Sequence, residues 1–146
     1  MTDRIVVISG FFNPIHGGHL DYIQSARLLG NRLIVIVNND LQVELKGSKL
    51  FMNEEERLRI VQNIKDVDKA VLSIDKDGSV CQSVRAEYYK FQNDVFFHSM
   101  TFANGGDRKE GGVPEDILEE ELGISMAYNI GGEKTQSSSE LLKNMD

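Results

Sequence analysis

The fold of this chain is decided near its beginning, where residues 5–19 read IVVISGFFNPIHGGH. The first four residues are β-branched and show no polar alternation, which is typical of a strand buried on both faces of a parallel sheet. Residues 9–14 predict a turn, in which Gly10 supplies a free φ and Pro14 a fixed one. From Gly17 onward apolar residues recur at three-residue steps, which indicates a helix. The stretch therefore predicts a strand, a loop and a helix that begins beside two histidines.

The rest of the chain repeats this alternation. Further strands are expected at residues 32–37, 70–74, 95–100 and 124–130, and helices at 53–64, 80–91, 114–122 and 137–143. The loops that follow strands, at residues 38–52, 104–112 and 131–136, are polar or rich in glycine. The pattern predicts an α/β fold with one doubly wound, Rossmann-like sheet of five parallel strands and helices on both faces. Such sheets bind ligands beyond the carboxyl ends of their strands, so these loops are expected to share one edge.

The two histidines, His16 and His19, are three residues apart and therefore share one face of the expected helix. Unpaired N–H groups at a helix start attract anions, two imidazoles there can donate to one set of phosphoryl oxygens, and Gly18 lets the backbone approach closely. The alternatives are a solvated pair or half of a zinc site, but the chain offers only His98 and Cys81 as further soft ligands. The pair is interpreted as catalytic, and no residue is assigned to a metal.

Composition limits the class of protein. A chain of 146 residues is long enough for one domain, residues 1–146, with its own core. The net charge of −7 argues against nucleic acid or an anionic membrane as a partner. A single cysteine excludes an internal disulfide framework and fits a reducing compartment. No apolar run reaches membrane-spanning length and residues 1–4 do not resemble a signal peptide, so a soluble, cytoplasmic protein is expected.

Three of the loops carry candidate phosphate ligands. Lys46 is a mobile point charge that suits a phosphate or a pyrophosphate leaving group, unless it is an ordinary surface lysine. Asp107 could accept from a ribose hydroxyl or help hold Mg²⁺, or serve as a turn residue. Ser137 and Ser138 cap the last expected helix and, with Lys134 before them, also suit a triphosphate tail. A P-loop and a Gly-x-Gly-x-x-Gly fingerprint are both missing from the sequence, which argues against a nicotinamide enzyme.

Other polar residues are given structural interpretations. Arg57 is expected to form a surface ion pair, with the loop edge of the sheet or a subunit partner as the alternatives. His98 is expected to pack within its strand. Cys81 opens a helix but has no suitably spaced base that would make it a nucleophile. The acidic runs 54–56 and 119–121 are interpreted as solvated faces and partners of helix dipoles.

Residues 10–19, GFFNPIHGGH, resemble the His-x-Gly-His signature of the nucleotidyltransferase superfamily. The similarity is greatest to its cytidylyltransferase-like branch, which includes glycerol-3-phosphate cytidylyltransferase and the adenylyl-transferring domain of ADP-heptose synthesis. Four further segments resemble that branch in order: 37–40 with 45–47, then 53–57, then 105–107, then 137–139. The resemblance covers essentially the whole chain.

The resemblance implies that a small phosphomonoester, such as a polyol phosphate or a sugar phosphate, attacks the α-phosphorus of a nucleoside triphosphate and releases pyrophosphate. It also implies Mg²⁺, no covalent enzyme intermediate, and a homodimer. His16, His19 and Lys46 would be the catalytic residues. The nucleotide-binding residues would be Gly10, Phe11, Phe12, Gly18, Gly106, Asp107, Lys134, Gln136, Ser137 and Ser138.

The chain departs from the family pattern at several positions. Phe11 stands where a small hydroxyl residue is frequent, and Asn13 where an aspartate is common. Residues 133–136 lack an arginine-led pattern, and Arg108 replaces an aromatic residue. The overall similarity favours CTP as the donor, whereas residues 13–15 also resemble the adenylyl-transferring branch, so both CTP and ATP are kept. A catalytically degenerate nucleotide-binding module and a flavodoxin-like cofactor carrier are the alternatives to an enzyme.

Overall fold

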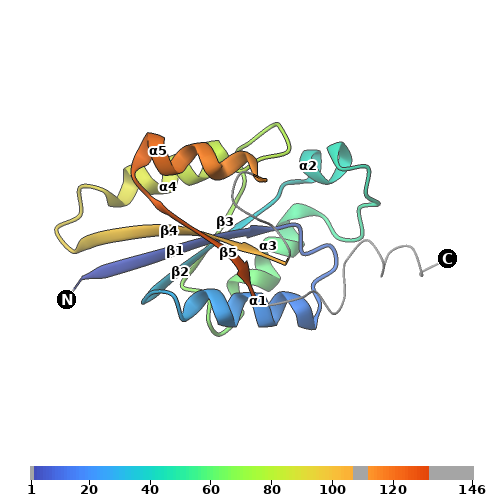
Figure 1. Ribbon diagram of the computed structural model, residues 1–146. Helices are drawn as coiled ribbons and strands as arrows, with labels where there is room; N and C mark the ends of the chain where they lie inside the picture. The colour runs from blue at the N-terminus through green and yellow to red at the C-terminus, as the bar shows by residue number, and fades with distance from the viewer. Residues whose placement is uncertain (1, 107–111, 132–146) are drawn as a thin grey trace.

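Five parallel strands form one sheet in the order β3-β2-β1-β4-β5 in the computed structural model, which describes residues 2–106 and 112–131 (Figure 1). The strands are β1 (Asp3–Gly10), β2 (Arg32–Val37), β3 (Lys69–Leu72), β4 (Phe97–Gly105) and β5 (Ser125–Ile130). The helices are α1 (Gly17–Arg27), α2 (Asp40–Leu45), α3 (Glu54–Gln62), α4 (Cys81–Phe91), the 3₁₀ turn η1 (Pro114–Asp116) and α5 (Ile117–Leu122). The described part of the chain contains no helix long and apolar enough to span a membrane.

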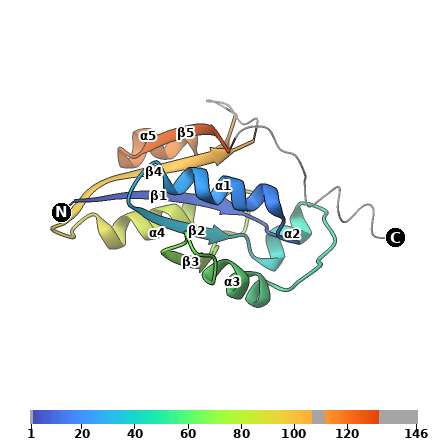
Figure 2. The same cartoon turned by 90° about the horizontal axis from the view of Figure 1, so that it is seen from below.

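Helices cover both faces of the sheet, as the sequence predicts. α1 and α3 lie against one face, and α4 and α5 against the other (Figures 1 and 2). Alternate residues of β1 serve the two faces: Val6 and Ile8 join the core under α1 and α3, whereas Ile5 and Val7 join the core under α4 and α5. Because β1 is buried on both sides, its sequence is continuously apolar.

The strand order reverses direction at β1, the first strand of the chain. β1 pairs with β2 on one side and with β4 on the other, so the crossovers leave it in opposite directions. Gly10 is level with Val37 in the register, and Phe11 and Asn38 therefore leave the sheet side by side. The loop that holds the histidines thus lies at the switch point of the sheet, where ligands bind in folds of this kind.

Residues 38–52, expected to form a loop, contain the helix α2 instead. Asn39 caps it: the Asn39 Oδ1 accepts from the Gln42 backbone N–H, and the Gln42 Oε1 accepts from the Asn39 N–H. The helix has only 6 residues and little apolar periodicity. Hydrogen bonds to the loop after β3 therefore help to stabilise it. The Gln42 side-chain amide donates to the backbone carbonyls of Asp77 and Ser79.

Two strands have boundaries that differ from the expected ones. β4 continues to Gly105 because it lies between β1 and β5, and the Asn104 side chain donates to the Ala127 carbonyl across that pair. β3 ends at Leu72 because the following residues turn toward α4, where the Ser83 hydroxyl accepts from the Ile74 N–H. The helix expected at 137–143 lies outside the described residues.

Candidate functional site

The two histidines form the cap of helix α1. His16 is the N-cap residue, and its Nδ1 accepts from the Gly18 backbone N–H at 3.1 Å. In return, the His19 Nδ1 accepts from the His16 backbone N–H, also at 3.1 Å. The two rings stack with their centroids 3.9 Å apart. This is the reciprocal arrangement of a capping box, with imidazoles in place of the usual hydroxyl and carboxylate.

This cap fixes which ring nitrogen of each histidine carries the proton. Backbone N–H groups donate to both Nδ1 atoms, so those atoms present lone pairs and the proton of the neutral ring is on Nε2. The His16 Nε2 is buried, although the residue as a whole is half-buried. The local fold therefore prepares two N–H donors, close together, at the start of a helix.

Phe12 closes the floor of this loop. It is almost wholly buried, has a positive φ of 51°, and its ring meets that of His19 edge-on at 5.0 Å. A Cβ on Gly10 would approach the Phe12 ring to 2.7 Å. The positive φ in this turn belongs to Phe12, whereas Gly10 is needed because its missing side chain makes room for the Phe12 ring.

Asn13 ties the histidine loop to the segment before α3. Its side-chain amide donates to the Lys49 carbonyl at 2.8 Å, and its Oδ1 accepts from the backbone N–H groups of Phe51 and Met52. The residue is 2% exposed. Because it both donates and accepts, an aspartate could not reproduce the whole pattern, which gives this departure from the family pattern a physical reason.

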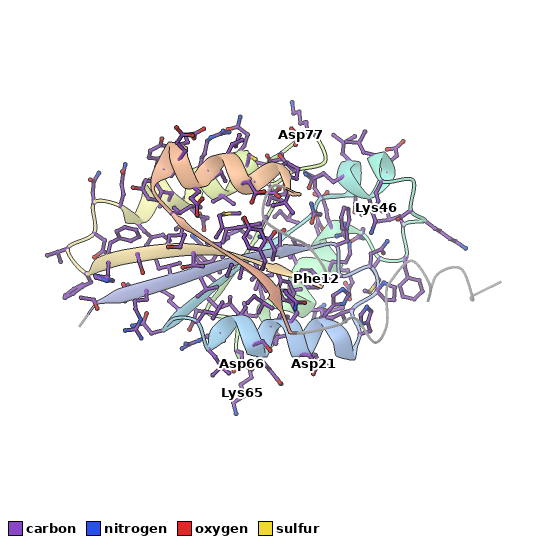
Figure 3. All side chains as sticks on the ribbon, in the orientation of Figure 1. Phe12, Asp21, Lys46, Lys65, Asp66 and Asp77 are labelled. Carbon is purple, nitrogen blue, oxygen red and sulfur yellow. The ribbon has the colours of Figure 1, made fainter. Side chains whose placement is uncertain are left out.

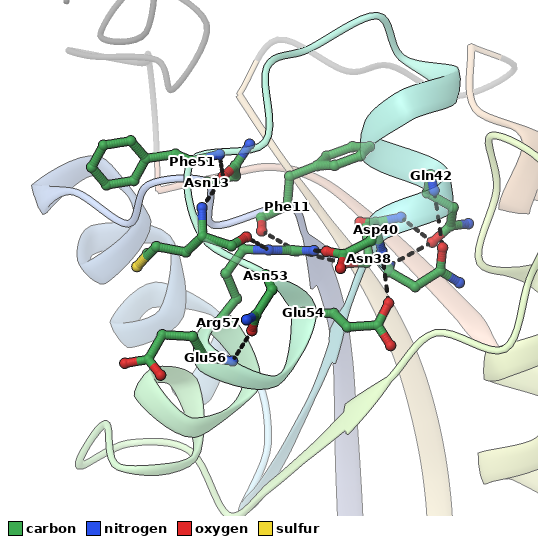
Figure 4. Close-up of polar contacts among 12 residues, drawn as sticks. Phe11, Asn13, Asn38, Asp40, Gln42, Phe51, Asn53, Glu54, Glu56 and Arg57 are labelled. Atoms are coloured by element: carbon green, nitrogen blue, oxygen red, sulfur yellow. Dashed lines mark hydrogen bonds and ion pairs between the residues drawn. The ribbon is translucent and has the colours of Figure 1, made fainter.

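Arg57 links four segments beneath the site (Figure 4). Its guanidinium donates to the carbonyls of Phe11, Asn38 and Met52 and pairs with Asp40, at distances of 2.6–2.9 Å. The side chain is wholly buried, so the expected surface ion pair was wrong. The reason is that β1 and β2 end at the same level. The backbone carbonyls of Phe11 and Asn38, which directly follow these strands, need a hydrogen-bond donor between them.

Lys46 stands at the C-cap of α2, on the same edge of the molecule as the histidine loop (Figure 3). The residue is exposed, and its Nζ lies over the Phe11 ring, 4.4 Å from the centroid. The described part of the chain thus brings His16, His19, Lys46 and their supporting residues to the end of β1. Gly106 directly follows the last residue of β4 and has a φ of 65°.

Five of the expected nucleotide-binding residues lie outside the described residues. They are Asp107, Lys134, Gln136, Ser137 and Ser138. Within residues 2–106 and 112–131, no group of three or more His, Cys, Asp or Glu side chains could hold a metal ion.

Two other sequence interpretations can be compared with the structure. His98 is exposed on β4, so the expected packed histidine was wrong. Cys81 begins α4 in the core, and burial raises the pKa of its thiol. A thiol with a raised pKa is a poor nucleophile, which agrees with its structural interpretation.

Comparison with known proteins gives the family. A sequence model described as cytidylyltransferase-like matches residues 7–105, from β1 to the end of β4. The chain belongs to the cytidylyltransferase-like family. The sequence resemblance to this branch is therefore confirmed, and so is the doubly wound fold.

Several curated proteins share sequence with the chain. It is 43% identical over 72 residues to the FAD synthase of Archaeoglobus profundus, which covers 49% of this chain and 46% of that protein. It is also 43% identical over 72 residues to the bifunctional protein HldE of Koribacter versatilis, covering 48% of this chain and 15% of that protein. The chain thus spans less than half the length of these two curated relatives.

Solved structures share the fold over nearly the whole chain. The lipopolysaccharide core biosynthesis protein of Thermoplasma volcanium is 25% identical, with a TM-score of 0.67, and the match covers 92% of this chain and 99% of that one. A bifunctional NMN adenylyltransferase/ADP ribose pyrophosphatase of Francisella tularensis, complexed with AMP and a Mn ion, has a TM-score of 0.66 at 14% identity. This second match covers 97% of this chain and 41% of that one, and shows the fold alone.

Arg57 was assigned to the loop edge of the sheet only as an alternative to a surface ion pair. It lies four residues before Val61, and both face the sheet from α3. A charged residue at an apolar position of an amphipathic helix was the available signal.

Proposed function

We propose that this member of the cytidylyltransferase-like family transfers a nucleoside monophosphate from a nucleoside triphosphate to a small phosphomonoester. A phosphate oxygen of the acceptor attacks the α-phosphorus and forms the new P–O bond. The bond between the α-phosphorus and the bridging oxygen breaks, and pyrophosphate leaves with the electron pair. The observation that carries this proposal is the pair of stacked histidines, whose Nε2–H donors sit at the start of α1 and at the switch point of the sheet.

The described residues have distinct tasks in this reaction. His16 and His19 donate from Nε2 to phosphate oxygens, where negative charge accumulates as the bond breaks. Lys46 supplies a positive charge to the α-phosphate or to the leaving pyrophosphate. The proposed contacts to the rest of the nucleotide are Gly106, Asp107, Lys134, Gln136, Ser137 and Ser138. The buried side chains of Phe12 and Arg57 support the loop. The backbone of the loop, at Gly10, Phe11, Phe12 and Gly18, remains a proposed contact to the nucleotide.

We include Mg²⁺ as an ion that arrives with the triphosphate, because Mg²⁺ commonly binds through one or two carboxylates together with substrate phosphates. Asp107 is the carboxylate that the sequence offers for this role. When bound in that way, the ion neutralises phosphate charge. We include it in the proposal as a companion of the nucleotide, and a homodimer as the assembly that the family resemblance implies.

ATP is the donor we propose first, with CTP as the alternative. The FAD synthases among the relatives are named for a product that contains an adenylyl group. That name extends the acceptors worth testing from polyol and sugar phosphates to a flavin mononucleotide. The sequence similarity that favours CTP keeps it in the test.

The experiment measures pyrophosphate release with Mg²⁺, using ATP or CTP and each of these phosphomonoesters in turn. We expect release that depends on one nucleotide and one acceptor, and that falls by roughly 10²–10³ in His16→Ala and in His19→Ala. His98→Ala is the matched control, since His98 is exposed on β4 away from the loop, and it should keep full activity. Nucleotide binding without release would favour the degenerate module, and the absence of both would contradict the proposal.

A further inference from the structure

Phe11 and Lys46 come from different segments and meet at the candidate site. Phe11 is the first residue after β1, and Lys46 follows the last residue of α2. The Lys46 Nζ lies 4.4 Å from the centroid of the Phe11 ring, within the range of a cation–π interaction. A small hydroxyl residue, frequent at position 11 in this family, would offer no ring to the ammonium group.

The Phe11 end of this contact is fixed by buried hydrogen bonds. The Phe11 carbonyl accepts from the Arg57 Nη1 at 2.8 Å, and that arginine is wholly buried. The backbone that carries the ring is therefore attached to the frame formed by β1, β2 and α3. Movement of the ring is restricted to its own side-chain torsions.

The Lys46 end is attached to the same frame through α2. The Lys46 backbone N–H donates to the Gln42 carbonyl at 3.0 Å, which closes the helix. Gln42 is 1% exposed, and its side chain is hydrogen-bonded to Asn38, Asp77 and Ser79. Both partners are thus carried by rigid parts, and the flexible piece between them is the lysine side chain.

We infer that Phe11 is a positioning residue that holds the Lys46 ammonium group at the end of β1, ready for the phosphates of the nucleotide. The inference rests on the proposed function, since it assigns Phe11 a task within that site. A lysine side chain that is ordered before binding loses less conformational freedom when the nucleotide arrives. Phe11 acts on the nucleotide through Lys46, so removing the ring should weaken nucleotide binding and leave the chemical step largely unchanged.

The chain supplies a matched control at the opposite end of the strands. The Phe91 ring, at the end of α4, also lies under cations: Arg32 at 5.1 Å and Lys69 at 5.3 Å. These cations begin β2 and β3, whereas the candidate site lies where β1 and β2 end. Phe91→Leu therefore removes the same ring and the same kind of contact far from the site.

The first measurement is the NMR spectrum of the lysine ε-CH₂ groups, recorded without nucleotide. A ring at this distance should shift the Lys46 signal upfield, the shift should disappear in Phe11→Leu, and it should persist in Phe91→Leu and in Phe11→Tyr. Lys46→Ala assigns the signal, with Lys65→Ala as a control, since Lys65 is exposed on the side of the molecule away from Lys46 (Figure 3). The absence of an upfield shift in the wild-type protein would overturn the inference without reference to any activity.

The second measurement is the affinity for ATP and CTP by calorimetry, followed by KM and kcat. We expect Phe11→Leu to weaken nucleotide binding by about two- to five-fold, the range for an exposed cation–π contact, with kcat nearly unchanged and Phe11→Tyr close to wild type. In the Lys46→Ala background, Phe11→Leu should have no further effect, whereas a packing defect would persist there. Equal nucleotide affinity in the wild type and Phe11→Leu would overturn the inference alone. A wild-type protein that binds neither nucleotide would overturn the proposed function.

Discussion

The imidazoles at the start of α1 occupy positions where short polar side chains usually cap helices. Their cap bonds use the Nδ1 atoms, so the proton of each neutral ring is on Nε2. One side chain therefore serves folding through one nitrogen and the proposed chemistry through the other. Substitutions at His16 can separate these two tasks.

We expect His16→Asn to keep the helix cap and lose the proposed activity. Asparagine is a strong N-cap residue, so it can accept from the Gly18 N–H as His16 does, but it places no donor where the Nε2–H lies. His16→Ala should lose both the cap and the activity, and the loss of the cap should lower the free energy of unfolding by about 0.5–2 kcal/mol. Urea denaturation and pyrophosphate release, measured on both variants, provide the comparison. Equal stability of the two variants would show that the cap contributes nothing.

Asp77, on the loop after β3, gives a second prediction at the residue scale. Hydrogen bonds from the Ser79 side chain and backbone lower the pKa of its carboxyl group. Its contribution to stability is therefore present above the pKa of the unfolded chain and lost as the pH falls through the lower folded value. Ser79→Ala should raise the Asp77 pKa toward its ordinary value, and carbon NMR titration of the carboxyl group measures the change. An unchanged titration curve would contradict this account.

At the scale of elements, Arg57 makes α3 the support of the site. It is the donor for carbonyls from the ends of β1 and β2 and from the residue before α3's own cap, and it pairs with the start of α2. A second bond attaches α2 to α3, since the Asp40 backbone N–H donates to the Glu54 carboxylate at the start of α3. The elements around the site are thus coupled through one guanidinium group.

We expect Arg57→Lys to destabilise the protein by about 3 kcal/mol or more, even though the charge is kept. A lysine offers a single ammonium group, which cannot reach carbonyls in three directions, so buried acceptors lose their donors. Arg59→Lys is the matched control because Arg59 is exposed two residues further along α3, and its cost should be small. Urea denaturation of the two variants measures the difference. A similar midpoint for both would mean that the Arg57 bonds are dispensable.

At the scale of the whole molecule, the sheet could be predicted and the polar network could not. The apolar runs 5–8 and 32–37 predict strands directly, because strands buried on both faces must be apolar throughout. Arg57 and Gln42 are both buried, but their partners come from loops that only the finished fold brings together. Local sequence carries no signal for such long-range pairs, which is also why α2 was expected to be a loop.

The histidine pair was predictable for the opposite reason. Its capping bonds join residues at most three apart in the chain, so the motif carries its own geometry wherever a helix follows a strand. The contact between Phe11 and Lys46 spans two elements and needed the structure. In this molecule, contacts between residues close in the chain could be predicted from the sequence, and contacts between distant residues could not.

The single cysteine allows the cooperativity of the whole molecule to be tested. Cys81 is 8% exposed and belongs to the core formed by α4, α5 and the sheet. Burial raises the pKa of its thiol, so the folded protein offers little of the reactive thiolate. We expect a thiol reagent to modify Cys81 slowly in native buffer and faster as urea approaches the unfolding midpoint, because the reaction requires the core to open.

A matched control places an exposed thiol one residue away. In a Cys81→Ser background, Gln82→Cys moves the thiol to an exposed position of α4, where it should react at once in native buffer. The raised pKa also fixes the sign of the pH effect: the thiol stabilises the fold below the pKa of the unfolded chain, and that stability is lost as the pH rises through the folded value. Stability should therefore fall less steeply at alkaline pH in Cys81→Ser than in the wild type. Rapid native labelling of Cys81 would instead mean that the α4 side of the core opens locally, independently of the site at the end of β1.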